Sequence, residues 1–229
     1  EEIGADLFVV GPEDPLVNGL ADRLRKSGKK VFGPGSDGAR LEGSKAWMKQ
    51  VLNEAGVATA RHGSFTDEKQ ALNFLDSMGD LFVIKTDGLA AGKGVLVTEN
   101  RGEAVDAVKS YLTGDAFGNA GKTVIIEEGL TGPELSVLAI CDGEQAFALS
   151  PAQDFKRIGD GDTGLNTGGM GAYSPVPIAS QEIVDSIMEE AVSPTLTALQ
   201  KRNIDYRGVL YCGLMFTPDG VKVLEYNVR

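Results

Sequence analysis

Residues 83–97, VIKTDGLAAGKGVLV, have the residue types and spacing to act on a phosphorylated ligand. They read as a strand, a glycine-rich loop and a second strand. Lys85 ends the first strand, and Lys93 stands between Gly92 and Gly94. Because glycine has no Cβ, backbone N–H groups can approach a phosphate there, and the lysines would add positive charge. Taken alone, the stretch fits a hairpin with a flexible tip equally well.

This loop differs from the P-loop of many nucleotide-binding proteins. A P-loop has four residues between its glycines and is followed by Lys-Ser/Thr and a helix. Here three residues separate Gly88 from Gly92, and a β-type run follows Gly94. The pattern is therefore not that of a P-loop.

Polar side chains also gather at the end of the last strand that the sequence predicts, 221–228. Side chains alternate between the two faces of a strand, so Glu225, Asn227 and Arg229 point to one side. A carboxylate and an amide oxygen suit a hard cation such as Mg²⁺, and an arginine beside them would meet the anion that the cation holds. The alternative is a solvated strand face.

Two other pairs of charged residues each admit a plain and a functional interpretation. Glu127 and Glu128 end an apolar strand, which indicates either an acidic site or a strand that reaches the surface there. Lys45 and Lys49 lie one turn apart on a predicted helix, where a solvated face is the usual explanation.

The segment 151–177 is a long polar loop, which is either disordered or functional. Its apolar residues argue against a free linker. Asp154, Lys156 and Arg157 stand beside the run at 166–169, NTGG, and together they suit an anion-holding loop.

Gly33–Gly38 matches the G-x-G-x-x-G pattern of dinucleotide-binding proteins. Pro34 removes an N–H donor where a pyrophosphate would need one, and the strand before it is the second of its unit rather than the first. A tight turn into a helix is the better interpretation.

The predicted elements indicate an α/β protein with a separate α+β unit. Strand 6–10, helix 16–26 and strand 30–32 suggest a parallel α/β piece. Residues 60–130 form a compact α+β unit of their own. The remaining predicted elements are helices at 44–55, 66–78 (capped by Thr66), 103–112 and 181–202 (broken near Pro194), and strands at 123–126, 134–140, 146–150, 208–217 and 221–228.

The composition argues against binding to nucleic acid or to an anionic membrane, because the 229 residues carry a formal net charge of −11. Cys141 and Cys212 lie in separate apolar runs, which favours buried thiols in a reducing compartment. The sequence shows no leader-like or long apolar run, so we expect a cytoplasmic protein. A chain that lacks an initiator Met and stops directly after a strand is expected to be a fragment.

In their order along the chain, these motifs resemble the glycinamide ribonucleotide synthetase (phosphoribosylamine–glycine ligase) family of the ATP-grasp superfamily. NTGGMGAYSP, within DTGLNTGGMGAYSP, is the most diagnostic of them. The resemblance covers nearly the whole chain and implies an α/β ATP-grasp fold, with an ATP-grasp domain at 43–229, an α+β lid at 60–130 and part of an N-terminal parallel α/β domain at 1–42. The other matching segments are VVGPEDPLVNGL, FGPGSDGARLEGSKAWMK, VIKTDGLAAGKGV, AFGNAGKTVIIEE, PAQDFKR and KVLEYNVR.

The resemblance also implies roles for single residues. Glu225 and Asn227 would hold Mg²⁺ or Mn²⁺, and Arg229 and Lys93 would be catalytic, with Arg229 steadying the acyl-phosphate stage. The residues implied in ATP binding are Lys45, Lys85 and Lys93 at the phosphates, Gly92 and Gly94 above them, Glu127, Glu128 and Leu130 at the adenine edge, and Glu134 at the ribose. Those implied in binding glycine and phosphoribosylamine are Gly11, Pro12, Glu13, Asp154, Lys156, Arg157, Asn166, Gly168 and Gly169.

The implied reaction consumes ATP to join glycine to 5-phosphoribosylamine through glycyl phosphate. Such phosphoryl transfer needs positioning and charge neutralisation rather than a general base. The implied partners are small molecules, with no nucleic acid and no membrane, and the protein is expected to be a monomer or a weak dimer. The alternatives are another ATP-grasp carboxylate–amine ligase or carboxylase of purine synthesis, a non-catalytic nucleotide-binding module and, from Gly33–Gly38, a dinucleotide-binding oxidoreductase.

The sequence departs from the family's pattern in several places. Phe155 stands where the family usually has histidine, Val228 where it usually has cysteine, and Glu134-Leu135 where a second acidic residue is common. The resemblance implies that the given sequence is a fragment, expected to lack the family's N-terminal glycine-rich strand–loop and the continuation after Arg229. Such a fragment is expected to bind ATP and to have half of one substrate pocket missing.

Overall fold

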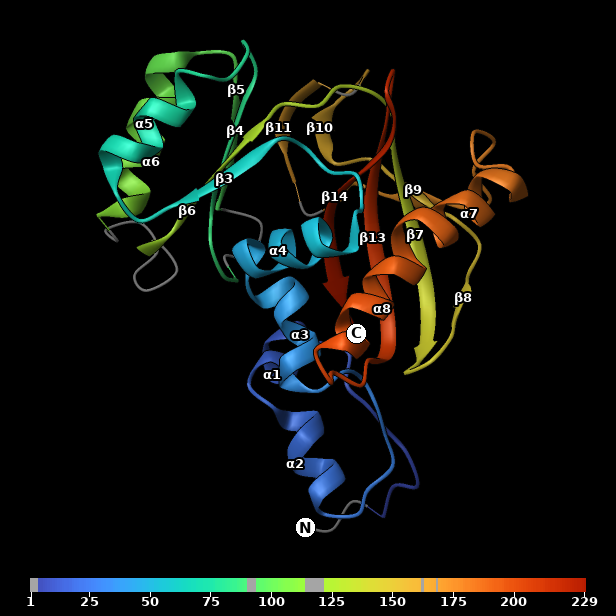
Figure 1. Cartoon of the computed structure of the whole chain (residues 1–229). Coiled ribbons are helices and arrows are strands. Elements are labelled where there is room, and N and C mark those ends of the chain that lie inside the picture. The colour runs from blue at the N-terminus through green and yellow to red at the C-terminus, as the bar shows by residue number, and fades with distance from the viewer. Residues whose placement is uncertain (1–3, 90–93, 114–121, 162, 168) are drawn as a thin grey trace.

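The computed structural model describes residues 4–89, 94–113, 122–161, 163–167 and 169–229. Figure 1 shows an N-terminal piece in blue at the bottom, a small α+β unit in cyan and green at the upper left, and a large unit in yellow to red. Among the described helices, none is long and apolar enough to cross a membrane.

The N-terminal piece contains two short parallel strands, β1 (Phe8–Val9) and β2 (Val31–Phe32), as the sequence predicted. The single helix predicted between them is wrong. The structure has α1 (Glu13–Val17) and α2 (Leu20–Lys26), and Gly19 between them has a left-handed φ of 75°. The leucine spacing continues across this break, so periodicity alone could not reveal it.

Two helices lead from this piece into the rest of the chain. The turn that begins at Gly33 does enter a helix, α3 (Ser36–Gly43), as predicted. Helix α4 (Lys45–Ala55) begins where the Ser44 side chain accepts a hydrogen bond from the backbone N–H of Trp47 (3.1 Å), which caps the helix.

The small unit, residues 60–130, is an antiparallel sheet of strand order β3-β6-β4-β5 with two helices packed against it. Its own apolar core includes Ile84, Val108 and Ile126. The cap of α5 is Asp67 rather than Thr66, because the Asp67 carboxylate accepts from the Gln70 N–H (2.9 Å). The elements are β3 (His62–Phe65), α5 (Glu68–Leu75), β4 (Phe82–Thr86), β5 (Val95–Thr98), α6 (Arg101–Leu112) and β6 (Val124–Glu128).

The large unit is built on a four-stranded antiparallel sheet of order β14-β13-β7-β8. The long strand β13 pairs with β7 on one side and with β14 on the other, so it lies inside the sheet. The predicted strands 208–217 and 221–228 pair as an antiparallel hairpin across Pro218-Asp219-Gly220. The strands are β7 (Glu134–Asp142), β8 (Ala146–Ala148), β13 (Arg207–Thr217) and β14 (Gly220–Val228).

The helical segment before β13 continues through Pro194, so the break predicted there is wrong. A π-helical turn, Met188–Val192, joins α7 (Gln181–Ile187) to α8 (Ser193–Lys201). Pro194 lies in the first turn of α8, where a residue without an N–H is well tolerated.

The predicted loop at 151–177 contains two short antiparallel ladders. One joins β9 (Gln153–Asp154) to β12 (Ala172–Tyr173), and the other joins β10 (Arg157–Gly159) to β11 (Thr163–Asn166). The rings of Phe155 and Tyr173 stack with their centroids 5.8 Å apart.

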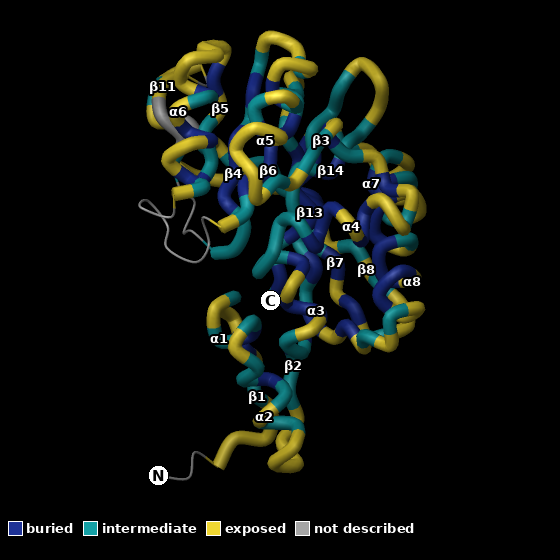
Figure 2. Tube along the Cα trace, turned by 60° about the vertical axis from the view of Figure 1, so that its left-hand side comes forward, coloured by how far each residue is buried: buried dark blue, intermediate teal, exposed yellow. Residues whose placement is uncertain are grey.

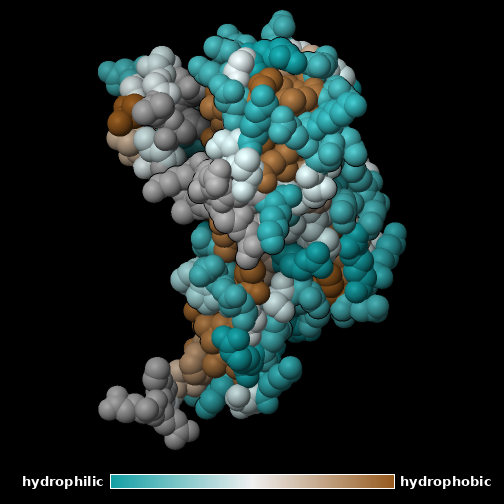
Figure 3. Space-filling model, turned by 90° about the vertical axis from the view of Figure 1, so that its left-hand side faces the viewer, coloured by the Kyte–Doolittle hydropathy of each residue, from teal (hydrophilic) through white to brown (hydrophobic). Residues whose placement is uncertain are grey.

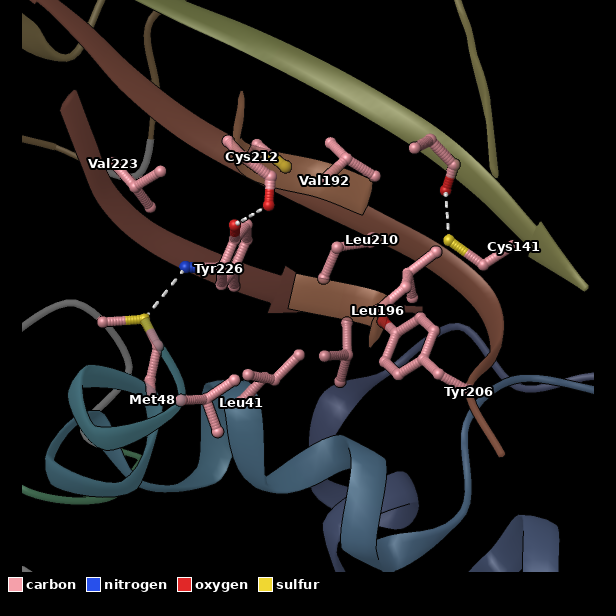
Figure 4. Packing of buried hydrophobic residues seen from close by; sticks show 14 of the residues in the cluster. Leu41, Met48, Cys141, Val192, Leu196, Tyr206, Leu210, Cys212, Val223 and Tyr226 are labelled. Atoms are coloured by element: carbon pink, nitrogen blue, oxygen red, sulfur yellow. Dashed lines mark hydrogen bonds between the residues drawn. The ribbon is translucent and has the colours of Figure 1, made fainter. Parts of the chain in front are cut away.

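One apolar core joins the N-terminal piece to the large unit, and Figure 2 shows its buried residues in dark blue. Tyr226 lies near its centre (Figure 4). The backbone N–H of Tyr226 lies 3.3 Å from the Met48 sulfur, and its hydroxyl lies 2.8 Å from Thr195 Oγ1. Leu16 and Leu41 belong to the same core. Strand β14 is therefore held firmly on its buried face.

Both cysteine thiols are expected to be unreactive in the folded protein. Cys141 and Cys212 are 1% and 0% exposed, and burial raises the pKa of Cys141 to about 12 and also raises the pKa of Cys212. Because thiol reagents need an accessible thiolate, we expect dithiobis-nitrobenzoate at pH 8 to leave both unmodified until denaturant is added. Rapid labelling of the native protein would contradict this burial.

Candidate active site

Lys85 and Glu127 form a buried ion pair on neighbouring strands of the small unit. The β4–β6 register places Val83 opposite Glu127, so Lys85 is a diagonal neighbour of Glu127 on the same face. Lys85 Nζ lies 3.0 Å from Glu127 Oε2. The Glu127 side chain is only 2% exposed, so the interpretation that this strand reaches the surface at Glu127 is wrong.

A second lysine, Lys49 of α4, joins the same carboxylate. Its Nζ lies 3.2 Å from Glu127 Oε1 and donates a hydrogen bond to Thr59 Oγ1 (2.7 Å). Thr59 in turn donates to the Val223 carbonyl of β14 (2.6 Å). The Lys49 side chain is 1% exposed, so the solvated face suggested for it is wrong.

The charges in this cluster shift one another's protonation. Burial lowers the pKa of Lys49 to about 8, although the Glu127 carboxylate opposes the shift. Burial alone would raise the pKa of Glu127, but the charges of Lys85 and Lys49 outweigh it and the pKa is lowered.

Lys45, one turn before Lys49, fastens the start of the glycine-rich loop to α4. Its Nζ donates to the Gly88 carbonyl (2.8 Å), while the Asp87 carboxylate accepts from Ser44 Oγ (3.1 Å) and from the Ala46 N–H (3.2 Å). Burial and the neighbouring charge of Lys85 lower the pKa of Lys45. This lysine thus belongs to the same electrostatic group as Lys85.

Glu225 and Asn227 lie half-buried on the face of β14 opposite the buried Tyr226 and Val228, as predicted. The alternation of buried and exposed side chains along β14 fails at Leu224, just before Glu225. A β-bulge at Leu224 places Val223 in the core instead. Among the described residues, neither the Glu225 carboxylate nor the Asn227 amide has a side-chain hydrogen-bond partner.

This donor set fits a magnesium ion. Mg²⁺ takes hard oxygen ligands, binds through one or two carboxylates and completes its shell with water and phosphate oxygens. Within the part of the chain that is described, no three acidic, histidine or cysteine side chains gather as a metal site, so phosphate and water would supply most ligands. The negative charge of Glu225 also favours raised pKa values for Lys45, Lys49 and Lys156. In each case this effect on the pKa is smaller than that of burial.

Arg229 forms ion pairs that connect the end of β14 with the N-terminal piece. Its guanidinium lies 2.8 Å from Glu42 Oε2 and 3.4 Å from Glu13 Oε2. The Glu42 carboxylate also accepts from the Val228 N–H (2.7 Å). Burial raises the pKa of Glu42 although the Val228 hydrogen bond and Arg229 oppose it. Pro12 is the residue before α1, so Gly11, Pro12 and Glu13 lead directly to this cluster.

Lys156 and Glu134 form a third charged pair, with 2.6 Å between Nζ and Oε2. Burial alone would lower the pKa of Lys156, but the Glu134 carboxylate outweighs it and raises the pKa. Asp154 lies in β9 beside them, and Gly169 has a positive φ of 119°.

The other predicted site residues are placed as follows. The Glu128 carboxylate accepts from the Arg61 N–H (2.9 Å) and lies 3.4 Å from Lys222 Nζ, so it turns away from the lysine cluster. The Gly94 carbonyl accepts from the Thr86 N–H (2.9 Å) at the base of the loop, and Leu130 is half-buried just after β6. Gly92, Lys93, Gly168 and the side chains of Arg157 and Asn166 lie outside the described residues.

The space-filling view shows the molecule hollowed on one side, between its upper half, which contains the small unit, and the N-terminal piece below (Figure 3). In Figure 2 the C-terminal end of β14 lies near α1. The Arg229 ion pairs with Glu13 and Glu42, together with the Val228–Glu42 hydrogen bond, join this end of β14 to the N-terminal piece.

Sequence reasoning missed the parts played by Lys49, Thr59 and Glu42. A signal for Lys49 exists, since Lys45, Met48, Lys49 and Leu52 follow the i, i+3, i+4, i+7 spacing of a buried helix stripe. No comparable local signal marks Thr59 or Glu42, because the contacts that tie them to β14, Thr59 with Val223 and Glu42 with Val228, join residues more than a hundred positions apart.

The chain matches two family profiles over its whole length. Residues 43–229 match the phosphoribosylglycinamide synthetase ATP-grasp (A) domain, and residues 1–42 match the phosphoribosylglycinamide synthetase N domain. A phosphoribosylamine–glycine ligase of Synechocystis sp. is 53% identical over 98% of this chain and 52% of its own length. The corresponding protein of Vibrio parahaemolyticus is 47% identical over the whole chain and 54% of its own length. The chain thus spans about half the length of these curated relatives.

Solved structures give the same fold. The phosphoribosylamine–glycine ligase of Thermotoga maritima superposes with a TM-score of 0.86 at 36% identity, over 96% of this chain and 54% of that one. A biotin carboxylase of Campylobacter jejuni has the same fold at 20% identity, with a TM-score of 0.78 over 98% of this chain and 49% of that one. The ATP-grasp fold inferred from the motifs is therefore confirmed, and this chain belongs to the phosphoribosylglycinamide synthetase family of ATP-grasp proteins.

Proposed function

We propose that the full-length protein containing this chain is a phosphoribosylamine–glycine ligase. It would convert ATP, glycine and 5-phosphoribosylamine into glycinamide ribonucleotide, ADP and phosphate. The proposal rests on the family to which the chain belongs and on the position of its charged side chains.

One observation of the structure carries the proposal. Lys49, which shares Glu127 with Lys85, donates a hydrogen bond to Thr59, and Thr59 donates to the Val223 carbonyl of β14, two residues before Glu225. These hydrogen bonds support a site in which cations that can hold phosphates lie near oxygen atoms that can bind a divalent metal. This is the arrangement that phosphoryl transfer from ATP requires.

The chain's own residues would mainly bind and orient. A glycine carboxylate oxygen attacks the γ-phosphorus as the bond to ADP breaks. The amine nitrogen of phosphoribosylamine then attacks the carbonyl carbon of glycyl phosphate, phosphate leaves, and the nitrogen loses a proton. Lys45 and Lys85 would hold the ATP phosphates, and Arg229 would hold the acyl phosphate near Glu13 and Glu42.

Glu225 and Asn227 are the residues that would hold Mg²⁺ or Mn²⁺. When bound there, the metal would neutralise negative charge on the transferring phosphoryl group. Two observations support this pair. The Glu225 carboxylate and the Asn227 amide lie on one face of β14, and among the described residues neither side chain has a hydrogen-bond partner.

The remaining binding roles belong to the same proposal. Glu127, Glu128 and Leu130 would form the adenine edge at the end of β6, and Glu134 would meet the ribose beside Lys156. We also propose that residues 60–130 act as the lid of an ATP-grasp domain at 43–229, preceded by part of an N-terminal domain at 1–42. The separate core of the small unit supports this division. The residues proposed to shape the glycine and phosphoribosylamine sites are Gly11, Pro12, Glu13, Asp154, Lys156, Arg157, Asn166, Gly168 and Gly169, and Lys93, Gly92 and Gly94 are proposed to close over the phosphates.

The test is ADP formation by the full-length protein with each substrate omitted in turn. We expect ADP only when Mg²⁺, glycine and freshly made phosphoribosylamine are all present, because the acyl phosphate must be captured by the amine for turnover to continue. Replacing glycine with alanine or bicarbonate separates this activity from those of other ATP-grasp ligases and carboxylases. ATP binding without ADP formation under any condition would indicate a non-catalytic nucleotide-binding module.

The proposal places the enzyme in the cytoplasm, as a monomer or weak dimer that acts on small molecules. Two free, buried cysteines suit a reducing compartment. Cell fractionation and light scattering of the purified protein test these two points.

A further inference from the structure

Lys49 is a fully buried charged side chain to which the proposed reaction assigns no role. It lies on α4, whose apolar side chains Trp47, Met48 and Val51 pack in the core of the large unit. Its ion-pair partner Glu127 lies on β6 of the small unit. The contact between Lys49 and Glu127 therefore joins the two units.

The cluster has one cation more than its single carboxylate can neutralise. Lys49, Lys85 and Glu127 are each less than a tenth exposed and together carry a net charge of +1. A buried charge without a partner is costly, so the excess favours an anion brought by a ligand. Without Lys49, Glu127 and Lys85 would form a closed neutral pair, and Lys85 would offer little net charge to a phosphate.

The hydrogen bonds around Lys49 fix its place relative to β14. Thr59 accepts from Lys49 Nζ and donates to the Val223 carbonyl, while the Val223 N–H donates to the Ala58 carbonyl (2.8 Å). This double link ties the chain that enters the small unit to the strand two residues before Glu225. Lys49 is thus linked to Lys85 through the Glu127 carboxylate and to β14 through the Thr59 hydroxyl.

We propose that Lys49 is a positioning residue. By pairing with Glu127, Lys49 neutralises part of the negative charge beside Lys85, so that the positive charge of Lys85 remains available to a nucleotide phosphate. The inference rests on the proposed function in that the phosphates are those of ATP. Lys49 itself does not touch the ligand. It acts by occupying one of the two oxygens of Glu127, which would otherwise serve Lys85 alone.

The experiment compares ATP with adenosine as ligands of the full-length protein, by calorimetry without glycine or phosphoribosylamine. Lys49→Met keeps the length of the side chain and removes its charge. We expect it to weaken ATP binding about tenfold or more, the effect of weakening one charge-assisted contact, and to change adenosine binding less than about threefold. Lys109→Met, at an exposed lysine of α6, is the matched control and should bind both ligands as the wild type does.

A double-mutant cycle separates charge sharing from a structural role. In a Glu127→Gln background, Lys49→Met should weaken ATP affinity much less than it does in the wild type, because Lys85 no longer faces a carboxylate. If Lys49→Met does not fold, Lys49→Gln keeps a donor for Thr59 and takes its place in every arm.

The possible outcomes differ in what they overturn. Three outcomes would overturn the role of Lys49 and leave the proposed function intact. Lys49→Met could weaken the affinities for ATP and adenosine equally, it could weaken neither, or it could weaken ATP affinity equally in the wild-type and Glu127→Gln backgrounds. Failure of the wild-type protein to bind ATP at all would overturn the proposed function, and the inference with it.

Discussion

Replacing Glu225 with glutamine is expected to abolish metal-dependent turnover of the full-length enzyme while the fold is kept. The substitution preserves the shape of the side chain, replaces one carboxylate oxygen with an NH₂ group that cannot bind a metal, and removes the only negative charge of the pair proposed to hold Mg²⁺. Neutralisation of a transferring phosphoryl group by a metal contributes several kcal/mol, and about 1.4 kcal/mol is a factor of ten in rate. We therefore expect a loss of about a hundredfold or more in kcat, measured as ADP release over a series of Mg²⁺ concentrations.

The matched control for this variant is Glu144→Gln, at an exposed glutamate in the turn between β7 and β8. Its turnover should equal that of the wild type. Circular dichroism should show both variants folded, because the buried face of β14 is formed by Tyr226 and Val228 rather than by Glu225. Near-normal turnover of Glu225→Gln at saturating Mg²⁺ would rule out the proposed metal site.

Replacing Lys85 with methionine is expected to weaken ATP binding by about 1.5–3 kcal/mol, the contribution of a hydrogen bond to a charged group. This corresponds to an increase of roughly 10- to 150-fold in the dissociation constant. The structure indicates that the variant will fold, because Lys49 remains to neutralise the buried Glu127 carboxylate. Calorimetric titration with ATP measures the effect directly.

The comparison for Lys85→Met is Lys69→Met, at an exposed lysine of α5 in the same small unit. ATP affinity should be unchanged in that variant. An unchanged affinity in Lys85→Met as well would show that Lys85 does not meet the phosphates, and the glycine-rich loop would then lose its proposed function.

Most of the elements could be predicted from residue spacing, and the errors have clear physical causes. The β13–β14 hairpin follows from an apolar alternation and a Pro-Asp-Gly turn, both of which are local. The break at Gly19 escaped detection because two helices in succession preserved one leucine spacing. The helix through Pro194 was misjudged because a π-helical turn places the proline where no donor is needed.

The site was less predictable than the fold, because its electrostatics depend on contacts between distant residues. The alternation rule placed Glu225 and Asn227 on one face, although a bulge shifts the strand just before them. That rule could not show that α4 approaches β6, so Lys49 looked like a surface lysine. Glu42 carried no sequence signal, and burial raises its pKa although its hydrogen bond from Val228 and its ion pair with Arg229 oppose the shift.

The two apolar cores differ in how much of the chain must exist before each can form. The buried residues of the small unit's core extend from Ala71 to Ile126, so all of them are present on the ribosome before residues 127–229 have been synthesised. The core of the large unit includes Val10 and also Val228, so it cannot close until β14 has been made. Contacts between near residues also form faster than contacts between distant ones. The half of the site that contains Lys85 can thus be assembled before the strand that carries Glu225 exists.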